Sequence, residues 1–274
     1  MTVVWVDGAL VEERAARVSP FDHGLLTGDG VFETLRVTRS RPFAATRHLD
    51  RLVRSAGGLR LPCPPEAMLR EAMDGVIRAN GIGEGRLRIT LTGGPAPLGS
   101  DRAAVPPTVI VAGGPLPAWP PATDVVVVPW PRNERGALAG LKTISYGENV
   151  VALAYARDHG AGEAIFANLA GNLCEGSGTN VFVGVDGRLV TPPLSAGCLA
   201  GVTRDLLLEM VDVVEADLPL DALRSAGEAF LTSSTRDVQP IRAVDGHALD
   251  ECPGRLTVEA AAAFEALMAR ELDP

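Results

Sequence analysis

The chain of 274 residues contains one lysine, Lys142, against 24 arginines. Arginine stays protonated at any working pH, whereas lysine becomes a nucleophile or a base once its surroundings favour the neutral amine. A free lysine, with a pKa of about 10.4, is almost fully protonated at neutral pH, so such a role requires a special environment. Leu141, Ile144 and the glycines at 140 and 147 are compatible with a buried, tightly turned segment. Lys142 is therefore a candidate catalytic residue; the alternative is an ordinary lysine on a solvated loop.

Two later segments carry groups that would complement such a lysine. In "CLAGVTRDLLLEM" (198–210), Gly201 permits a tight turn into a helix. The amides of Val202 and Thr203, with the Thr203 hydroxyl, would then form an anion site suited to phosphate. In "GNLCEGSGTNVFV" (171–183), Glu175 stands between a strand end and a glycine-rich turn, where a carboxylate could hold a proton on a heterocycle nitrogen. The alternatives are a plain helix start and a solvated loop carboxylate.

Composition excludes several classes of function. The net charge of −9 and the pI of about 5.0 argue against nucleic acid and anionic membrane as partners, because both require basic patches. The start of the chain lacks the pattern of a signal peptide, and no apolar run is long enough to span a membrane. The four cysteines form no C-x-x-C pair, and no histidines have metal-ligand spacing. We expect a cytoplasmic protein with reduced thiols and no metal site.

The elements that position these residues follow from periodicity. Strands are predicted at 31–37 and 86–92, with helices between them on which Leu49, Leu52 and Val53, and then Leu69, Met73, Val76 and Ile77, share a face. Further helices are predicted at about 147–158, 202–213 and 257–270. The proline-rich segment 113–124 is the best linker candidate. We therefore expect an α+β protein with a small domain at 1–112, a linker at 113–124 and a larger domain at 125–274, and clefts between domains are common sites for small ligands.

Six segments in this order resemble the class IV aminotransferases, which are the fold-type-IV pyridoxal-phosphate enzymes. They are "SPFDHGLLTGDGVFETLRV", "RHLDRL", "LKTISYGENVVA", "GAGEAIFANLAGNLCEGSGTNVF", "LVTPPLSAGCLAGVTR" and "EAFLTSSTRDVQPI". The family includes branched-chain aminotransferases, D-amino-acid transaminases and aminodeoxychorismate lyases. The resemblance implies a small N-terminal α/β domain and a larger C-terminal domain with a β-barrel-like core. It also implies a homodimer in which residues 23–30 reach the neighbour's active site.

The resemblance implies a role for each candidate residue. Lys142 would form the internal aldimine with pyridoxal 5'-phosphate and then move the proton between Cα and C4′. Glu175 would keep the pyridinium nitrogen protonated, Tyr146 would reach the ring O3′, and Leu199 would pack on the ring face. The phosphate would be held by Arg51, Val202, Thr203 and Ser234.

Strand periodicity indicates which residues are candidates for contact with the substrate. Phe32, Thr34 and Arg36 share one face of their strand, and Val31, Glu33 and Leu35 share the other. In the family the first face lines the substrate pocket, so Arg36 is a candidate for binding a substrate carboxylate; the alternative is a surface arginine on an edge strand. The remaining candidate substrate contacts are Arg88, Arg236, Thr27 and Thr235.

Departures from the family pattern leave three functions open. In the loop "GGPAPLGSDR", which follows the strand at 86–92, Leu98 and Ser100 stand where D-amino-acid transaminases carry an arginine and a histidine. Thr27 replaces a tyrosine typical of branched-chain enzymes. The favoured hypothesis is a transaminase that exchanges an amino group between an amino acid, with the D enantiomer as one candidate, and a 2-oxo acid. The second is 4-amino-4-deoxychorismate lyase, which releases pyruvate and 4-aminobenzoate. The segment "LAGLK" resembles the corresponding segment of these lyases. The third is a non-catalytic cofactor-binding protein, which the retained Lys142, Glu175 and Arg51 argue against.

Overall fold

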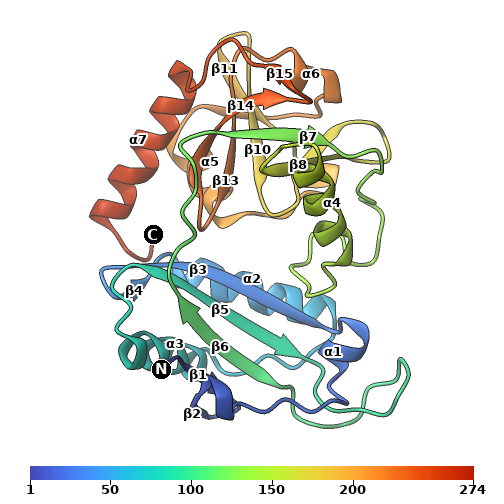
Figure 1. Cartoon of the computed structure of the whole chain (residues 1–274), viewed down its shortest axis with the longest axis vertical. Coiled ribbons are helices and arrows are strands. Elements are labelled where there is room, and N and C mark those ends of the chain that lie inside the picture. Colours follow the sequence, from blue (N-terminus) through green and yellow to red (C-terminus); the bar gives the residue numbers. More distant parts are fainter. The chain divides into compact units, whose positions relative to one another are not determined.

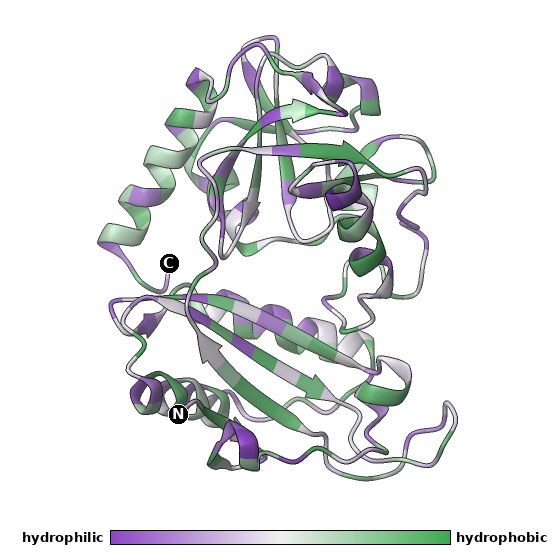
Figure 2. Cartoon of the chain, in the orientation of Figure 1, coloured by the Kyte–Doolittle hydropathy of each residue, from purple (hydrophilic) through white to green (hydrophobic).

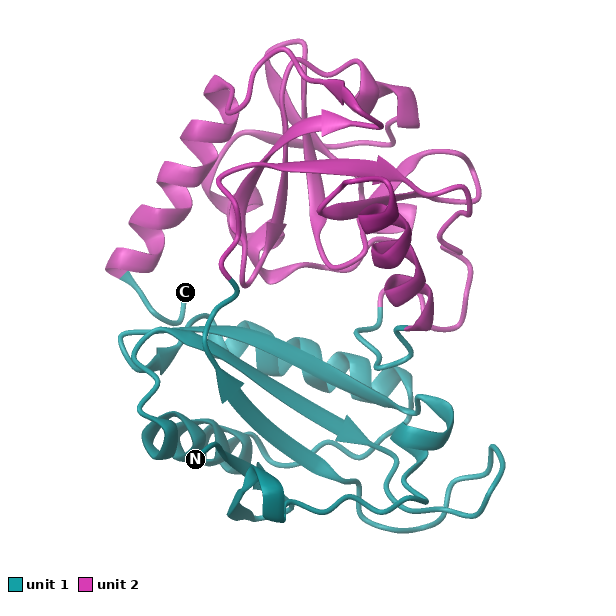
Figure 3. Cartoon of the chain, viewed as in Figure 1, with its two compact units in different colours: residues 1–117, 141–146, 271–274 teal, residues 118–140, 147–270 magenta.

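The computed structural model describes residues 1–274 and contains two compact units (Figure 3). Unit 1 comprises Met1–Pro117, Leu141–Tyr146 and Glu271–Pro274. Unit 2 comprises Ala118–Gly140 and Gly147–Arg270. The chain thus passes from unit 1 to unit 2 inside the expected linker. Lys142, which falls within the range 125–274 expected for the second domain, is grouped by its contacts with unit 1.

Unit 1 is built on a six-stranded antiparallel sheet in the order β2-β1-β6-β5-β3-β4 (Figure 1). Its strands are β1 (Val3–Val6), β2 (Ala9–Glu12), β3 (Gly30–Thr38), β4 (Arg41–Pro42), β5 (Gly85–Thr92) and β6 (Val109–Gly114). Its helices are α1 (His23–Thr27), α2 (Ala45–Gly58) and α3 (Glu66–Asn80). The two strands predicted at 31–37 and 86–92 are therefore adjacent, paired as β3 and β5 along eight residues.

The two long helices of unit 1 cover one face of this sheet. Helix α2 packs along β3, and α3 packs along β6 and β1. The core between them contains the β3 residues Val31 and Leu35 together with Leu52 and Met73. Val53, predicted to lie on the apolar face of α2, is instead 53% exposed, because Leu49, Leu52 and Ala56 already fill the buried stripe at helical spacing. Phe32, Thr34, Arg36 and Arg88 lie on the opposite face of β3 and β5.

Unit 2 contains a nine-stranded mixed sheet in the order β12-β11-β10-β13-β14-β7-β8-β9, with β15 paired to β14. Its strands are β7 (Thr123–Val127), β8 (Glu163–Ala167), β9 (Leu173–Gly176), β10 (Asn180–Val185), β11 (Arg188–Thr191), β12 (Val213–Glu215), β13 (Ala229–Ser233), β14 (Asp237–Val244) and β15 (His247–Ala248). Strand β9, at one end of this order, also contacts β10 near the other end. The sheet therefore curls into a half-barrel, as expected for a fold-type-IV enzyme.

Four helices belong to unit 2: α4 (Gly147–Asp158), α5 (Val202–Met210), α6 (Leu220–Arg224) and α7 (Arg255–Arg270). Helix α5 ends three residues before its predicted limit because the backbone at Val211 is extended and leads into β12. Helix α7 buries Thr257, Ala260, Phe264 and Leu267 at helical spacing, and Figure 2 shows its alternating hydrophilic and hydrophobic bands. No helix of the protein combines the length and the apolar character that crossing a bilayer requires.

Candidate active site

In unit 1 the backbone on either side of Lys142 is fixed to β3. The Lys142 carbonyl accepts from the amide of Phe32 at 3.0 Å, and the amide of Ile144 donates to the carbonyl of Gly30 at 2.9 Å. The Lys142 amide donates to Ser55 Oγ at 3.1 Å. Its side chain is half-buried, so the environment is less enclosed than the flanking apolar residues suggested. These contacts fix the direction in which the Cα–Cβ bond of Lys142 leaves the backbone.

Aromatic rings surround the amine of Lys142. Its Nζ lies 4.4 Å from the centre of the Phe32 ring and 5.9 Å from that of Tyr146. The two rings contact each other edge to face, with centroids 5.0 Å apart. The guanidinium carbon of Arg88 lies 3.8 Å from the Phe32 ring centre, so an amine and a guanidinium share one aromatic side chain. Both contacts have the geometry of cation–π interactions.

The other predicted substrate contacts of unit 1 are placed as follows. Thr34 and Arg36 follow Phe32 on the same face of β3, and Thr34 lies directly opposite Arg88 on β5. The side chains of Thr34 and Arg36 are half-buried. Thr27 ends the short helix α1, where its hydroxyl donates to the carbonyl of His23 at 2.9 Å. The structure therefore brings Thr34 and Arg36 to the sheet face that carries Phe32.

Arg51, the predicted phosphate ligand, is a buried residue held by an acidic partner. Its Nε and Nη2 each donate to the Glu33 carboxylate at 2.7 Å, and His48 Nδ1 lies 2.7 Å from the same group. Burial raises the pKa of Glu33, but Arg51 and His48 outweigh it and hold the pKa well below its usual range. Burial lowers the pKa of His48 despite the opposing effect of Glu33. Arg51 is thereby positioned by a charged, two-pronged contact.

Sequence reasoning assigned no role to Glu33 or His48. A signal was present, because Glu33 shares its face of the strand with the apolar residues Val31 and Leu35. A carboxylate on a core face is costly without a partner. That cost predicts a buried cation nearby, although not which of the many arginines supplies it.

In unit 2 the carboxylate of Glu175 lies on β9 and contacts both Leu199 and Arg132. Its Oε2 accepts from the amide of Leu199 at 2.9 Å. Its Oε1 lies 3.3 Å from Nε of Arg132, whose guanidinium stacks 4.0 Å from the centre of the Phe166 ring. Glu175 is thus a half-buried strand residue rather than a solvated loop carboxylate. Arg132 is a functional candidate that the sequence analysis did not single out.

The start of α5 has the features of an anion site. Val202 and Thr203 are buried in its first turn, and the residue before them, Gly201, provides no side-chain cap. The first amides of a helix have no partner within the helix. The side chain of Asn180 packs against Gly201 and donates to the carbonyl of Leu199 at 2.8 Å. This contact fixes the turn that leads into the helix.

The loop between β13 and β14 consists of Ser234, Thr235 and Arg236, since Ser233 pairs with Asp237 across it. Ser234 and Thr235 are half-buried residues, whereas the side chain of Arg236 is buried. Arg236, a candidate for the substrate carboxylate, is engaged by protein groups instead: Glu163 Oε2 lies at 3.1 Å and the Trp119 ring centre at 3.8 Å.

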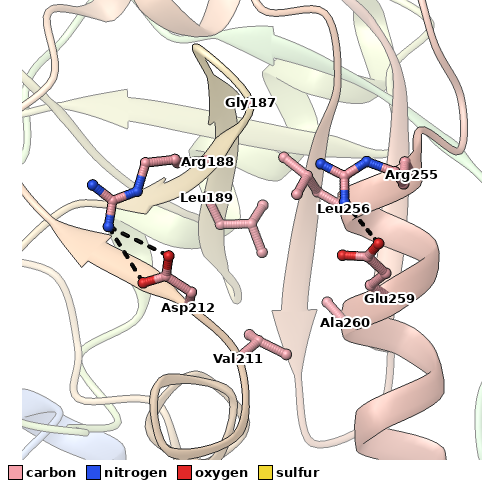
Figure 4. A pocket seen from close by; sticks show the side chains of 9 residues that line it. All are labelled: Gly187, Arg188, Leu189, Val211, Asp212, Arg255, Leu256, Glu259 and Ala260. Carbon is pink, nitrogen blue, oxygen red and sulfur yellow. Dashed lines mark hydrogen bonds and ion pairs between the residues drawn. The ribbon is translucent and has the colours of Figure 1, made fainter.

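A separate cavity of about 210 Å³ lies elsewhere in unit 2 (Figure 4). It opens between β11, the end of α5 and the start of α7. Its arginines are both paired, Arg188 with Asp212 at 3.3 Å and Arg255 with Glu259 at 2.7 Å. None of the predicted site residues lines it, so it is not the candidate active site.

The family model "Amino-transferase class IV" matches residues 30–244. The chain belongs to the class IV aminotransferase family. It is 32% identical over 258 residues to the putative branched-chain-amino-acid aminotransferase of Methanocaldococcus jannaschii, covering 90% of this chain and 89% of that protein. It is 30% identical over 285 residues to the aminodeoxychorismate lyase of Bacillus subtilis, covering 98% of this chain and 94% of the relative.

A solved structure carries the same architecture. The branched-chain amino acid aminotransferase of T.th., determined with pyridoxamine 5'-phosphate, superposes with a TM-score of 0.91 at 26% identity, covering 98% of this chain and 95% of that one. Class IV aminotransferases are pyridoxal-5'-phosphate enzymes, and this chain is one of them.

The residues of this chain fit that cofactor. Lys142 offers an amine for the aldehyde, and Glu175 offers a carboxylate for a ring nitrogen. The uncapped start of α5 offers amides for a phosphate. Thr232, two residues before Ser234, buries a hydroxyl that has no protein partner. Each functional part of the cofactor therefore has a chemically matched group in the protein.

Proposed function

We propose that the protein transfers the amino group of an amino acid to a 2-oxo acid, with Lys142 as the covalent and acid–base residue. The observation that carries this proposal is that the only lysine has both backbone groups bonded and its amine against Phe32 and Tyr146. When bound, the cofactor supplies an electron sink that stabilises negative charge at the substrate Cα. With the cofactor bound, Lys142 would remove the proton at the substrate Cα and would deliver it to C4′. No arginine could perform either task.

The other candidates have supporting roles in this proposal. Glu175, oriented by the Leu199 amide and Arg132, accepts from the protonated ring nitrogen and keeps its proton in place. Tyr146 would donate to the ring O3′, and Leu199 would pack on the ring face. The phosphate would be bound by the guanidinium of Arg51, the amides of Val202 and Thr203, and the hydroxyls of Thr203 and Ser234. A helix start and an arginine fork both favour a dianion.

We further propose that Arg88, with Arg36 as the second candidate, binds the substrate carboxylate. Arg88 and Lys142 contact the same Phe32 ring, which suits a compact substrate whose carboxylate and amino group are separated by one carbon. Arg236 is the weaker candidate because its guanidinium already contacts Glu163 and Trp119. Thr34, on the same face as Arg36, and Thr27 and Thr235 remain candidate contacts for the rest of the substrate.

Aminodeoxychorismate lyase is the second candidate function. The "LAGLK" segment and the 30% identity to the B. subtilis lyase support it. A lyase also requires Lys142 to remove the Cα proton, but it expels pyruvate and needs no second substrate. The two functions are distinguished by whether an oxo-acid acceptor is required for turnover.

The covalent role of Lys142 is tested by reduction with borohydride followed by peptide mass spectrometry. Because the chain has one lysine, a phosphopyridoxyl group on a lysine side chain is unambiguous. We expect the label on the peptide that contains Lys142, and no fixed cofactor and no turnover in Lys142→Ala. Wild-type turnover by the Lys142→Ala protein would contradict the proposal.

A further inference from the structure

The last residue of the loop formed by Ser234, Thr235 and Arg236 belongs to a buried ion pair with Glu163. Arg236 Nη2 is 3.1 Å from Glu163 Oε2, and the two side chains are only 6% and 2% exposed. Removing two charges from water is costly, so a buried pair is poorly explained by a gain in stability alone. In the proposed function neither Glu163 nor Arg236 contacts the cofactor.

Arg236 is anchored on more than one side. Its Nη1 donates to Gln239 Oε1 at 2.6 Å, and its guanidinium lies 3.8 Å from the Trp119 ring centre. Gln239 in turn donates to the carbonyl of Pro120 at 2.8 Å. A planar fork with donors on two edges and a face for stacking is required here, and lysine offers neither. The last residue of the loop is therefore fixed to β14 and to segment 119–120.

Glu163 connects the same loop to the strand of Glu175. Its Oε1 accepts from the amide of Ala164 at 3.0 Å, from the amide of Ser177 at 3.2 Å and from the Ser177 hydroxyl. Ser177 lies two residues after Glu175. One buried carboxylate thus binds Arg236 with one oxygen and the segment that follows Glu175 with the other.

We propose that Glu163 and Arg236 are positioning residues that hold the Ser234 loop and the Glu175 strand in a fixed relation. The inference rests on the proposed function, in which Ser234 binds the phosphate and Glu175 the ring nitrogen of one rigid cofactor. The two contacts are made together only if the loop and the strand keep a constant separation. Arg236 therefore acts on the cofactor through the loop and is not the ligand of the substrate carboxylate.

Local geometry of the loop does not replace this connection. The amide of Arg236 donates to Ser233 Oγ at 3.1 Å, and Asp237 adopts a left-handed backbone with φ of 56°. These features set the shape of the three-residue turn. They do not link the loop to the segment that follows Glu175, whereas the Glu163 carboxylate contacts both Arg236 and Ser177.

The test uses Arg236→Gln, Arg236→Lys, Glu163→Gln and the double variant Arg236→Gln/Glu163→Gln. The control is Glu228→Gln, which removes the charge of another buried carboxylate of unit 2 that also accepts from backbone amides and a hydroxyl, those of Leu256 and Thr257. The readouts are the dissociation constant of pyridoxal 5'-phosphate from the cofactor-free protein, the ³¹P resonance of the bound phosphate, and the KM of the amino acid.

Each single variant at 163 or 236 should weaken cofactor binding by about ten- to a hundredfold and alter the ³¹P resonance, because the binding groups are displaced. The double variant should bind the cofactor about as weakly as the single variants, since both residues act through one connection. The control should lower the Tm while leaving the dissociation constant and the ³¹P resonance unchanged. Arg236→Lys and the double variant leave no unpaired charge at Glu163. These two variants provide the test if Arg236→Gln does not fold.

Two results would overturn the inference. One is a raised KM in Arg236→Gln with unchanged cofactor affinity and ³¹P resonance, which would make Arg236 a substrate ligand. The other is a set of dissociation constants that matches the control throughout. Cofactor binding is measured without amino acid, so a protein that shows the predicted pattern but does not transaminate would contradict the proposed function and not this inference.

Discussion

Arg88 and Arg86 are two residues apart on β5, and this spacing offers a direct test of the carboxylate site. Both lie on the exposed face of the strand, but only Arg88 contacts the Phe32 ring that also contacts Lys142. We expect Arg88→Gln to raise the KM of the amino acid by about ten- to a hundredfold, as for loss of a hydrogen bond to a charged group. Arg86→Gln should leave KM unchanged. Equal effects in the two variants, measured by steady-state kinetics, would place the carboxylate elsewhere.

At the residue scale, the candidate reacting groups were easier to recognise in the sequence than the residues that contact them. Lys142 was conspicuous because it is the only lysine, and Glu175 and Thr203 stood in segments with family counterparts. Arg132 and Glu163 gave no comparable signal. Their importance comes from contacts with residues far along the chain, such as Arg236 for Glu163, and no local spacing encodes such a contact.

At the scale of elements, the start of α5 depends on a close approach between a glycine and an asparagine. A Cβ on Gly201 would collide with the side chain of Asn180, which supports the carbonyl of Leu199. We expect Gly201→Ala to weaken cofactor binding by about five- to a hundredfold, because overpacking costs about 1–3 kcal/mol. Gly227→Ala is the matched control, since a Cβ there has no atom within 4 Å. Cofactor titration showing the same affinity in both variants would remove the proposed role of this turn.

The contact between α2 and β3 should make stability depend on pH through His48. The pKa of buried His48 lies below its ordinary value of 6.5, so the unfolded chain binds a proton that the folded protein does not, and stability falls as the pH drops below 6.5. We expect the Tm of the cofactor-free protein to fall between about pH 8 and about pH 5.5. The fall in Tm should be smaller in His48→Asn. Each 1 kcal/mol of pH-dependent unfolding free energy that the substitution removes should reduce the fall by about 2–4 °C. An identical pH dependence in both proteins would show that His48 does not contribute.

Elements with strong periodicity were predicted well from sequence, and their exceptions have physical causes. The strands β3 and β5 and the helix α4 lie within a few residues of their predicted limits. Val53 was misplaced because a helical stripe has a limited width, and the length of α5 was overestimated because Val211 continues the apolar pattern into β12. The assignment of Lys142 to unit 1 results from hydrogen bonds between its segment and β3, which no sequence pattern reports.

For the whole molecule, the apolar surface around α1 favours assembly of two copies. Leu25 and Phe21 are 71% and 51% exposed, and the adjacent loop carries Leu98 at 75%. Clustered exposed apolar side chains of this size mark interaction surfaces. We expect light scattering to give twice the chain mass of 28.6 kDa for the wild type and for Val258→Glu, a control at another exposed apolar residue. Leu25→Glu should be monomeric. A fully active wild-type monomer at assay concentration would contradict this prediction.

The central claim is that Lys142 catalyses transamination, and a half-reaction followed by absorbance tests it most directly. The enzyme loaded with pyridoxal 5'-phosphate is mixed with one amino acid, D-alanine or L-leucine, without any acceptor. We predict that the near-visible band of the bound cofactor disappears as pyridoxamine 5'-phosphate accumulates, and that 2-oxoglutarate restores the band. The contradicting result is an unchanged spectrum with amino acids of either hand, while aminodeoxychorismate yields 4-aminobenzoate without an acceptor.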